Sequence, residues 1–462
     1  MSQPAGGAEK TPGYASLATQ TRRRVTARLM PFLFLLYVIA YVDRINISFA
    51  ALQMNGELGF SDSVFGFGSG IFFFGYTLLA IPGAMLVERW SARKAIAATM
   101  VAWGLIASAS GFIHAKAGFY SMRLLLGVAE AGFFPGMITY LSHWHRAEDR
   151  AKAVAVFMTA IPVSRVVASP VSAVLLTVNW LGLAGWRWLL ILEGAPAIAL
   201  GIACLFYLTD WPEQARWLSA AQRDWLAGEM ERENYEKRRS GRACFREALR
   251  GRDVWLLCLA YFGGTAGEYG LSLWLPKILQ RLGHQSAART ALLTAIPSLA
   301  AIPAMVLCGA HSDRTGERRW HAALPRMAAG AALVALAAQS LGVPAALGAF
   351  SVATAGIVAA YGPLWAIPTG ILGSSAAAAS IGLINAFGNM GGFAGPYIIG
   401  WFSSRTGEYA GGLWSVAAAL AGSGAFALLV RRRPQPAQLD SAADLARAPG
   451  RQAAVCDDVP LP

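Results

Sequence analysis

The apolar residues of this 462-residue chain fall into blocks of roughly 20 residues, separated by short charged segments. A helix of about 20 residues crosses roughly 30 Å of hydrocarbon, so each block is long enough to span a membrane. A closed barrel would need short alternating strands with turn residues between them, and the sequence has no such pattern. Only 14% of the residues are charged, well below the share in soluble proteins. The sequence therefore predicts an all-α membrane protein.

Charged loops and turn residues divide the chain into twelve expected spans. These cover residues 29–52, 64–87, 93–113, 118–141, 150–178, 186–208, 253–281, 290–310, 321–341, 343–370, 376–402 and 410–430. The hydrophilic stretch 209–252 separates the sixth span from the seventh, and its charge run is typical of a solvated linker. We therefore expect six-helix bundles over 29–208 and 253–430, with polar tails at 1–28 and 431–462.

Basic residues occupy alternate loops between the blocks and give the chain a net charge of +13. Arg89, Arg93 and Lys94 lie in one such loop, whereas residues 45–87 contain neither Lys nor Arg. An excess of Lys and Arg in cytoplasmic loops is the usual orientation signal of membrane proteins. The distribution predicts that both termini are cytoplasmic, and it indicates a lipid bilayer rather than nucleic acid as the partner of the positive charge.

The five cysteines show no paired spacing, and the six histidines show no metal-ligand spacing. Neither a disulfide framework nor a metal site is expected. The sequence also lacks a nucleophile and base arranged as in an enzyme, so we expect no enzymatic activity and no cofactor.

The two halves of the chain repeat one loop. The segment from Ala84 to Lys94 follows the second expected span, and the segment from Gly309 to Arg319 follows the eighth at a constant offset of 225 residues. Both carry an acid, a base, a small residue and two bases. Duplicated halves related by an axis along the membrane normal, with a binding site between them, are one architecture of secondary transporters.

These loops resemble the signature G-x-x-x-D-R-x-G-R-K of the major facilitator superfamily, although Glu88 and Ser91 replace its Asp and Gly in the first copy. Five longer strings resemble the anion:cation symporter branch of that superfamily. They are Tyr41–Asn46, Arg123–Pro135, Ser312–His321, Gly362–Pro368 and Asn385–Pro396.

The resemblance extends over residues 28–430 and implies twelve transmembrane helices in two pseudo-symmetric six-helix bundles. Bacterial members of the branch import sugar acids, tartrate and aromatic acids such as hydroxyphenylacetate or phthalate, generally with protons. The resemblance thus implies a monomeric transporter of the bacterial inner membrane that takes a small organic anion, with H⁺ as coupling ion.

Ionisable residues inside the spans identify the expected site, because each costs about 2.5–3.5 kcal/mol to insert. Asp43 and Arg44 lie in the first span, and Arg123 and Glu130 lie two helical turns apart in the fourth. A guanidinium fits a carboxylate with two parallel donors. We expect Arg44 or Arg123, or both, to bind the substrate carboxylate, and Asp43 and Glu130 to carry protons. The alternative is that these residues form only interhelical ion pairs.

Further site residues follow from the resemblance and from position. The resemblance adds Tyr41, Tyr76 and Asn389 as hydrogen-bond partners of the substrate. Trp365 either stacks against substrate or lines a broken helix. Arg165 either faces the cavity, where it would bind a second carboxylate or alter selectivity, or pairs with a neighbouring acid or snorkels; Glu268 is a second candidate for the cavity. Four glycines at positions 388, 391, 392 and 395 are expected to permit close helix packing or bending.

The repeated loops are expected to form charge networks that hold the cytoplasmic face closed. The expected gate residues are Glu88, Arg89, Arg93, Asp313, Arg314 and Arg318. The alternative is a set of solvated loops, because exposed ion pairs are individually weak.

Two other functions remain open. An exchanger or drug exporter of the same superfamily would share the fold, but exporters typically carry a Gly-rich motif in the fifth span, which residues 162–170 lack. A transporter-like sensor is the other alternative.

Overall fold

The computed structural model describes residues 12–89, 91–239, 249, 251–338, 342–371 and 374–431. For residues 12–15, 81, 83–89, 147, 151, 234, 236–239, 338, 369–371 and 374–379 the description covers the backbone alone. The expected tails at 1–11 and 432–462 lie outside the described residues.

The first half of the chain, called the N-half here, comprises α1 to α8. Its helices are α1 (Pro12–Leu58), α2 (Asp62–Arg89), α3 (Ala92–Ala109), α4 (Lys116–Glu130), α5 (Phe133–Trp144), α6 (Ala147–Met158), α7 (Ala160–Leu175) and α8 (Gly185–Tyr207). Three short 3₁₀ turns accompany them at η1 (Ser110–Phe112), η2 (Trp180–Gly182) and η3 (Pro212–Gln214).

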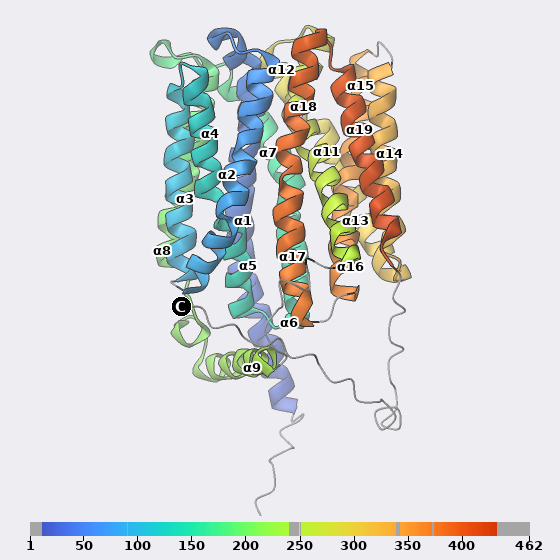
Figure 1. The fold of residues 1–462 in the computed structure, drawn as a ribbon. Coiled ribbons are helices and arrows are strands. Elements are labelled where there is room, and N and C mark those ends of the chain that lie inside the picture. The colour runs from blue at the N-terminus through green and yellow to red at the C-terminus, as the bar shows by residue number, and fades with distance from the viewer. Residues whose placement is uncertain are drawn as a thin grey trace, which may run out of the picture.

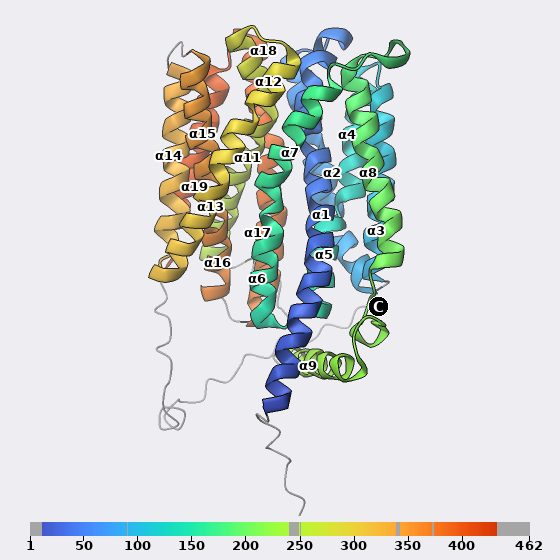
Figure 2. The same cartoon turned by 180° about the vertical axis from the view of Figure 1, so that it is seen from behind.

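The second half, called the C-half, comprises α11 to α19. Its helices are α11 (Arg252–Gly283), α12 (Ala287–Leu293), α13 (Ala295–Thr315), α14 (Arg319–Ala338), α15 (Val343–Ala359), α16 (Tyr361–Ile371), α17 (Ser374–Asn389), α18 (Gly391–Thr406) and α19 (Ala410–Leu429). The two halves stand side by side with their helices roughly parallel to one another (Figures 1 and 2).

Each of the twelve expected spans corresponds to one long helix or to two helices in line. Over the described part of the chain, nine segments are long and apolar enough to cross a membrane. The segments formed by α11, by α14 and by α17 with α18 complete the twelve. The predicted fold, an all-α membrane protein of two six-helix bundles, is confirmed.

Five of the spans are broken where the sequence suggested one continuous helix. In four of them a proline, at position 135, 162, 297 or 363, lies three residues after the break. Proline lacks the N–H that would bond to the carbonyl four residues earlier, and its ring clashes with that carbonyl. The fifth break lies between α17 and α18 at Met390, where two glycines follow instead.

The expected linker is not wholly solvated, because α9 (Ala220–Arg239) lies across one end of the bundle (Figures 1 and 2). Trp225, Leu226 and Met230 on α9 are buried. Arg146 pairs with Glu229 on α9 at 3.1 Å. An apolar stripe inside the charge run therefore docks this helix on the N-half, and we call this end of the molecule the linker end.

The expected N-terminal tail is also partly ordered, since α1 begins at Pro12 and extends beyond the bundle at the linker end (Figure 2). Arg22 forms an ion pair with Asp149, and Thr26 contacts the ring of His145 at 3.5 Å. Burial lowers the pKa of the His145 imidazole below its ordinary value. These contacts with α6 and the segment before it extend the helix beyond the span.

The halves meet most closely at the end opposite the linker, where α2 begins. A Cβ on Gly66 of α2 would lie 2.6 Å from the carbonyl oxygen of Pro396 on α18. Asp62 pairs with Lys277 of α11 and accepts a hydrogen bond from Ser403 of α18. This end of the molecule is therefore closed by direct contact between the two halves.

Glycines also bring α17 and α18 against α11. Gly391 lies against the carbonyl oxygen of Phe262, and Gly395 lies against that of Ala266. A side chain at either position would collide with the α11 backbone. The expected role of this glycine group in close helix packing is confirmed.

Candidate transport site

Eight ionisable side chains lie in the middle of the bundle, and we call them the central charged set. They are Asp43, Arg44, Arg123, Glu130, Arg165, Glu193, Glu268 and Arg326. Four are arginines and four are acids, so their formal charges cancel. The set comes from α1, α4, α7, α8, α11 and α14, which means that the tertiary structure gathers residues distributed over both halves.

Arg44 of α1 pairs with Glu130 at the end of α4. Its Nη2 and Nε donate to the same carboxylate oxygen of Glu130, at 2.6 and 3.2 Å. The guanidinium also lies over the rings of Tyr41 (5.1 Å) and Tyr76 (5.3 Å), as cation–π partners do. Arg44 and Glu130 thus form an interhelical ion pair, the kind of pair that the alternative expected, whereas Asp43 and Arg123 take part in no ion pair among the described residues. Neighbouring residues on a helix point in different directions, which separates Arg44 from Asp43.

Arg123 is a buried arginine whose hydrogen-bond donors are only partly used by the described residues. Its side chain is 3% exposed and lies 4.9 Å from the ring centre of Phe72. Within the described residues, Nε and Nη2 of Arg123 have no hydrogen-bond partner. A buried guanidinium with unused donors is unfavourable on its own and suits an anion that arrives from outside the protein.

Two acids of the set have no cationic partner within the part of the chain that is described. Asp43 accepts a hydrogen bond from Asn46 at 3.1 Å, and its second carboxylate oxygen is unsatisfied. Glu193 accepts a long hydrogen bond of 3.4 Å from Ser172, and its second oxygen is likewise unsatisfied. Both are buried, so a negative charge on either one is poorly compensated.

A pair of tyrosines connects the two halves beside Arg44. The hydroxyl of Tyr41 lies 3.3 Å from that of Tyr269 on α11, and Arg44 donates to Tyr269 at 3.4 Å. The ring of Tyr269 also packs against Phe73 at 4.3 Å. Tyr269 was not among the site residues expected from the sequence. Its position next to Glu268 within a span could have indicated it.

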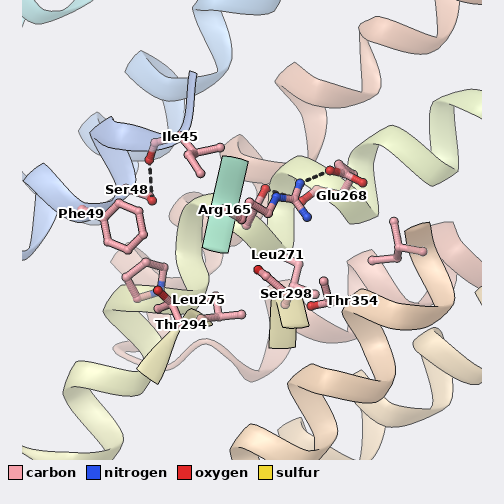
Figure 3. Close-up of a pocket in the computed structure, with 13 residues that line it drawn as sticks. Ile45, Ser48, Phe49, Arg165, Glu268, Leu271, Leu275, Thr294, Ser298 and Thr354 are labelled. Carbon is pink, nitrogen blue, oxygen red and sulfur yellow. Dashed lines mark hydrogen bonds and ion pairs between the residues drawn. The ribbon is translucent and has the colours of Figure 1, made fainter. Parts of the chain in front are cut away.

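Arg165 of α7 and Glu268 of α11 form a buried ion pair across the two halves (Figure 3). Arg165 pairs with an acid, Glu268, and it also lines a cavity, so the structure shows both arrangements that the sequence left open. A cavity of about 40 Å³ adjoins the pair. Its lining includes hydroxyl groups from four helices, contributed by Ser48, Ser272, Thr294, Ser298 and Thr354. Arg165 and Glu268 therefore lie at a polar cavity between the halves.

Arg326 of α14 was missed by the sequence analysis. It is fully buried, and its Nη1 donates to the carbonyl oxygen of Ala260 (3.0 Å) and to Ser423 (2.7 Å). Its Nε and Nη2 have no partner within the described residues. The signal was a single arginine inside the otherwise apolar ninth span.

Trp365 and Asn389 lie in the C-half near Tyr261. The ring of Trp365 is 4.8 Å from that of Tyr261, and α16, which carries it, begins directly after a helix break. Asn389 is the last residue of α17 and donates to Asn385 at 3.3 Å. No direct hydrogen bond joins these two residues to the central charged set within the described side chains, so their contact with substrate stays a prediction.

The expected gate residues lie at the linker end. Arg93 pairs with Asp210 at 3.7 Å and donates to the carbonyl oxygen of Leu205. Arg318 pairs with Asp313 of its own loop. Arg314 is exposed, and the side chains of Glu88 and Arg89 lie outside the described residues. These contacts remain within one half each, and the gating role stays a prediction.

The geometry defines a class of protein: a bundle of twelve membrane-spanning segments in two halves, with a buried polar site between them. Such a protein is a secondary transporter rather than an enzyme. Comparison with known sequences agrees, because the family description Major Facilitator Superfamily matches residues 33–396. The chain belongs to the major facilitator superfamily.

Its relatives are transporters. The chain is 44% identical to a protein of Agrobacterium vitis named "Putative tartrate transporter", over 90% of this chain and 96% of that one. It is 34% identical to a "Quinolone resistance transporter" of Acinetobacter baumannii, over 85% and 90% of the two chains. A bacterial homologue of the lysosomal transporter Spinster has the same fold, with a TM-score of 0.70 at 19% identity, over 87% of this chain and 96% of that one.

Proposed function

We propose that this protein imports a small organic acid by proton symport, through alternating access of the central charged set to the two sides of the bacterial inner membrane. The observation that carries the proposal is the buried guanidinium of Arg123, whose donors Nε and Nη2 have no partner among the described residues. The relative named for tartrate transport supports a carboxylate, and sugar acids and aromatic acids belong to the same class.

Two arginines would hold the substrate carboxylate. Arg123 has donors without a partner among the described residues. Arg44 forms an ion pair with Glu130, which lies on the same helix as Arg123. A planar guanidinium binds a carboxylate through two parallel hydrogen bonds. A carboxylate placed between these arginines competes with Glu130 for Arg44, which couples anion binding to the release of Glu130. Tyr41 and Tyr76, whose rings pack under Arg44, would hold its guanidinium in position.

Charge balance provides the argument for proton coupling. The central charged set is formally neutral, so an anion bound within it adds an uncompensated negative charge in a medium of low dielectric constant. Protonation of one of the acids removes that charge. Glu130 becomes available when substrate takes Arg44, and Asp43 has no cationic partner within the described residues. We therefore assign proton transfer to these two acids, with H⁺ as the coupling ion and no other cofactor.

Orientation follows from the basic loops. The starts of α3, α6 and α14 lie at the linker end (Figure 1), and Arg93, Arg146 and Arg318 lie at or next to these starts. The positive-inside rule assigns that end, with both termini, to the cytoplasm. The contact of α2 with α18 then closes the periplasmic side in this structure. We infer that the protein works as a monomer, because the site is complete within one chain.

The test is uptake into proteoliposomes with an imposed pH gradient, screened over tartrate, sugar acids and aromatic carboxylates. We expect at least one carboxylate to accumulate faster when the outside is acidic, and a protonophore to abolish the effect. The absence of acid-stimulated uptake for every carboxylate would rule out symport.

The relative named for quinolone resistance makes drug export the competing function. Inverted vesicles that accumulate a fluoroquinolone on acidification of their lumen, without uptake of any organic acid in the first assay, would favour it.

A further inference from the structure

The ion pair between Arg165 and Glu268 is not required by the proposal above, and it has unusual features. Both residues are buried, at 8% and 3% exposure. Arg165 uses Nη2 for one oxygen of Glu268, while its Nε and the other oxygen of Glu268 have no partner within the described residues. A bidentate pair would be stronger. The guanidinium of Arg165 therefore uses only part of its hydrogen-bonding capacity in the pair with Glu268.

We propose that Glu268 occupies the position of a second substrate carboxylate on Arg165, and that a dicarboxylate displaces Glu268 from Arg165 onto Arg326. This inference rests on the proposed function and names the substrate class, a short hydroxylated dicarboxylate. Arg165 becomes the residue that distinguishes dicarboxylates from monocarboxylates, and Glu268 becomes an internal competitor for that position.

Cationic groups lie close to the tyrosine pair formed by Tyr41 and Tyr269. Arg44 donates to Tyr269, and Tyr269 follows Glu268, the partner of Arg165, directly in α11. The hydroxyls of Tyr41 and Tyr269 lie 3.3 Å apart between the two halves. One arginine, Arg44, contacts this tyrosine pair directly, and the other, Arg165, pairs with the residue that precedes Tyr269 in α11. A molecule with a carboxylate at each end and hydroxyls between them matches this order of groups.

The cavity beside Arg165 offers space for the second carboxylate. The cavity beside Arg165 measures about 40 Å³, enough for a few water-sized groups at about 10–15 Å³ each. Figure 3 shows Ser298 and Thr354 on the side of the cavity below Arg165 and Glu268. When Glu268 moves away, the space of its own carboxylate adds to the cavity. The hydroxyl-lined wall then satisfies the outer oxygens of the incoming group.

The displaced Glu268 needs a new cationic partner, because a buried carboxylate without such a partner is destabilising. Gly264 and Glu268 are four residues apart on α11 and share one face, one helical turn apart. A Cβ on Gly264 would lie 2.7 Å from Nη2 of Arg326, which has no hydrogen-bond partner within the described residues. The unused donor of Arg326 therefore lies on the helix face that carries Glu268, within reach of a change of its rotamer.

Each carboxylate keeps a guanidinium as its partner in this exchange. Before binding, Arg165 holds Glu268, and Arg326 has no acidic partner among the described residues. Afterwards, Arg165 holds the second substrate carboxylate and Arg326 holds Glu268. A monocarboxylate with a hydroxyl in place of its second carboxylate cannot drive the exchange, since a neutral group does not replace an anion on Arg165.

The experiment compares tartrate with threonate, in which a CH₂OH group replaces one carboxylate of tartrate. Affinities are measured by isothermal titration calorimetry on the full-length protein in detergent, after thermal unfolding has shown that each variant is folded. We expect the wild type to bind tartrate more tightly. Arg165→Gln should reduce tartrate affinity by about 10–100-fold, to the level of threonate. Glu268→Gln should increase tartrate affinity by about tenfold, with threonate affinity unchanged.

The role of Arg326 is tested by rescue. Arg326→Gln should weaken tartrate binding by about tenfold, because displaced Glu268 then lacks a partner. The double variant Glu268→Gln with Arg326→Gln should regain the tartrate affinity of Glu268→Gln. In that variant no displaced carboxylate at position 268 requires Arg326 as its new partner. A purely structural role for Arg326 would leave the double variant at least as weak as the single one, and that result overturns the proposal.

Failure of this inference is distinguishable from failure of the proposed function. If the wild type transports tartrate and threonate equally well, or if Glu268→Gln weakens tartrate binding as Arg165→Gln does, acid import stands and the displacement of Glu268 is refuted. If the wild type neither binds nor transports any carboxylate, both proposals are overturned.

Discussion

At the scale of single residues, the buried arginines differ in how fully their donors are used. Arg187 donates to Glu57 and to the carbonyl oxygens of Gly111 and Ile113. Arg123 has two nitrogens without a partner among the described residues. A guanidinium saturated by the protein fastens helices together, whereas one with free donors is available to a ligand. This contrast separates structural arginines from candidate binding arginines more clearly than burial does.

The first prediction concerns Arg123→Lys. Lysine retains the positive charge but loses the planar fork that binds a carboxylate bidentately. We expect the affinity for the transported acid to fall by roughly 10–100-fold, the effect of losing a charge-assisted hydrogen bond. Equilibrium binding measures it, with Arg216→Lys at an exposed position as matched control. Wild-type affinity in Arg123→Lys would remove Arg123 from the binding site.

The second prediction concerns Glu130→Gln. Glutamine can still contact Arg44 but cannot carry a proton, so gradient-driven accumulation should be almost completely lost while exchange of substrate across the membrane persists. Both are measured in proteoliposomes with labelled substrate. Glu213→Gln, in an exposed turn, is the control. Normal accumulation by Glu130→Gln would exclude this carboxyl from coupling.

A third prediction concerns Arg187→Met. The substitution leaves the carbonyl oxygens of Gly111 and Ile113 without their donor, which costs roughly 1–3 kcal/mol for each buried acceptor. We expect a lower temperature of unfolding in detergent with an unchanged order of substrate preference. A changed preference at unaltered stability would mean that Arg187 is more than a structural link.

At the scale of elements, glycines determine how closely helices of the two halves approach. Gly66 and Gly70 on α2 face α18, and a Cβ on either would lie within 3 Å of an α18 carbonyl oxygen. The proposed alternating access requires this contact to open and close again. The small residues therefore define a surface at which the halves can meet without interlocking.

The fourth prediction is that Gly66→Leu opens this end of the molecule. The added side chain cannot fit against Pro396, so the population should shift toward the conformation in which α2 and α18 are apart. A Ser403→Cys reporter, buried at this end in a background without native cysteines, should then react faster with a membrane-impermeant thiol reagent. Gly118→Leu, which meets no atom within 4 Å, is the control. An unchanged labelling rate would contradict the assigned contact.

At the scale of the whole molecule, contacts between the halves lie at the centre and at the end opposite the linker. Asp62 with Lys277 and Ser63 with Ser404 join the halves at that end, and Arg165 with Glu268 joins them at the centre. The docked α9 packs only against the N-half among the contacts described. Two rigid halves that rock about the central site are consistent with this distribution.

The fifth prediction tests that motion. The backbone N–H of Ser63 donates to the hydroxyl of Ser404 at 2.6 Å, which places the two residues close enough for a disulfide. Ser63→Cys combined with Ser404→Cys should lose transport on oxidation and regain it with a reductant, while each single variant stays active. Full transport by the oxidised double variant would show that this end need not open.

The sequence by itself determined the class of the fold. Block length, the share of charged residues and the repeated loop defined twelve spans in two halves, because crossing hydrocarbon imposes the same length and backbone bonding on every segment. The same physics singled out Asp43, Arg44, Arg123 and Glu130 as charged residues within spans. It did not indicate where four spans would break, although prolines three residues after each break carried that information.

Only the tertiary structure decided which charges meet. Arg44 reaches Glu130 on α4, Arg165 reaches Glu268 in the other half, and Arg326 lies against Gly264 of α11. These partners are 86, 103 and 62 positions apart in the chain. Their contact depends on the rotation and packing of each helix, which hydropathy leaves undetermined because it records how apolar a segment is and not which neighbour each face meets.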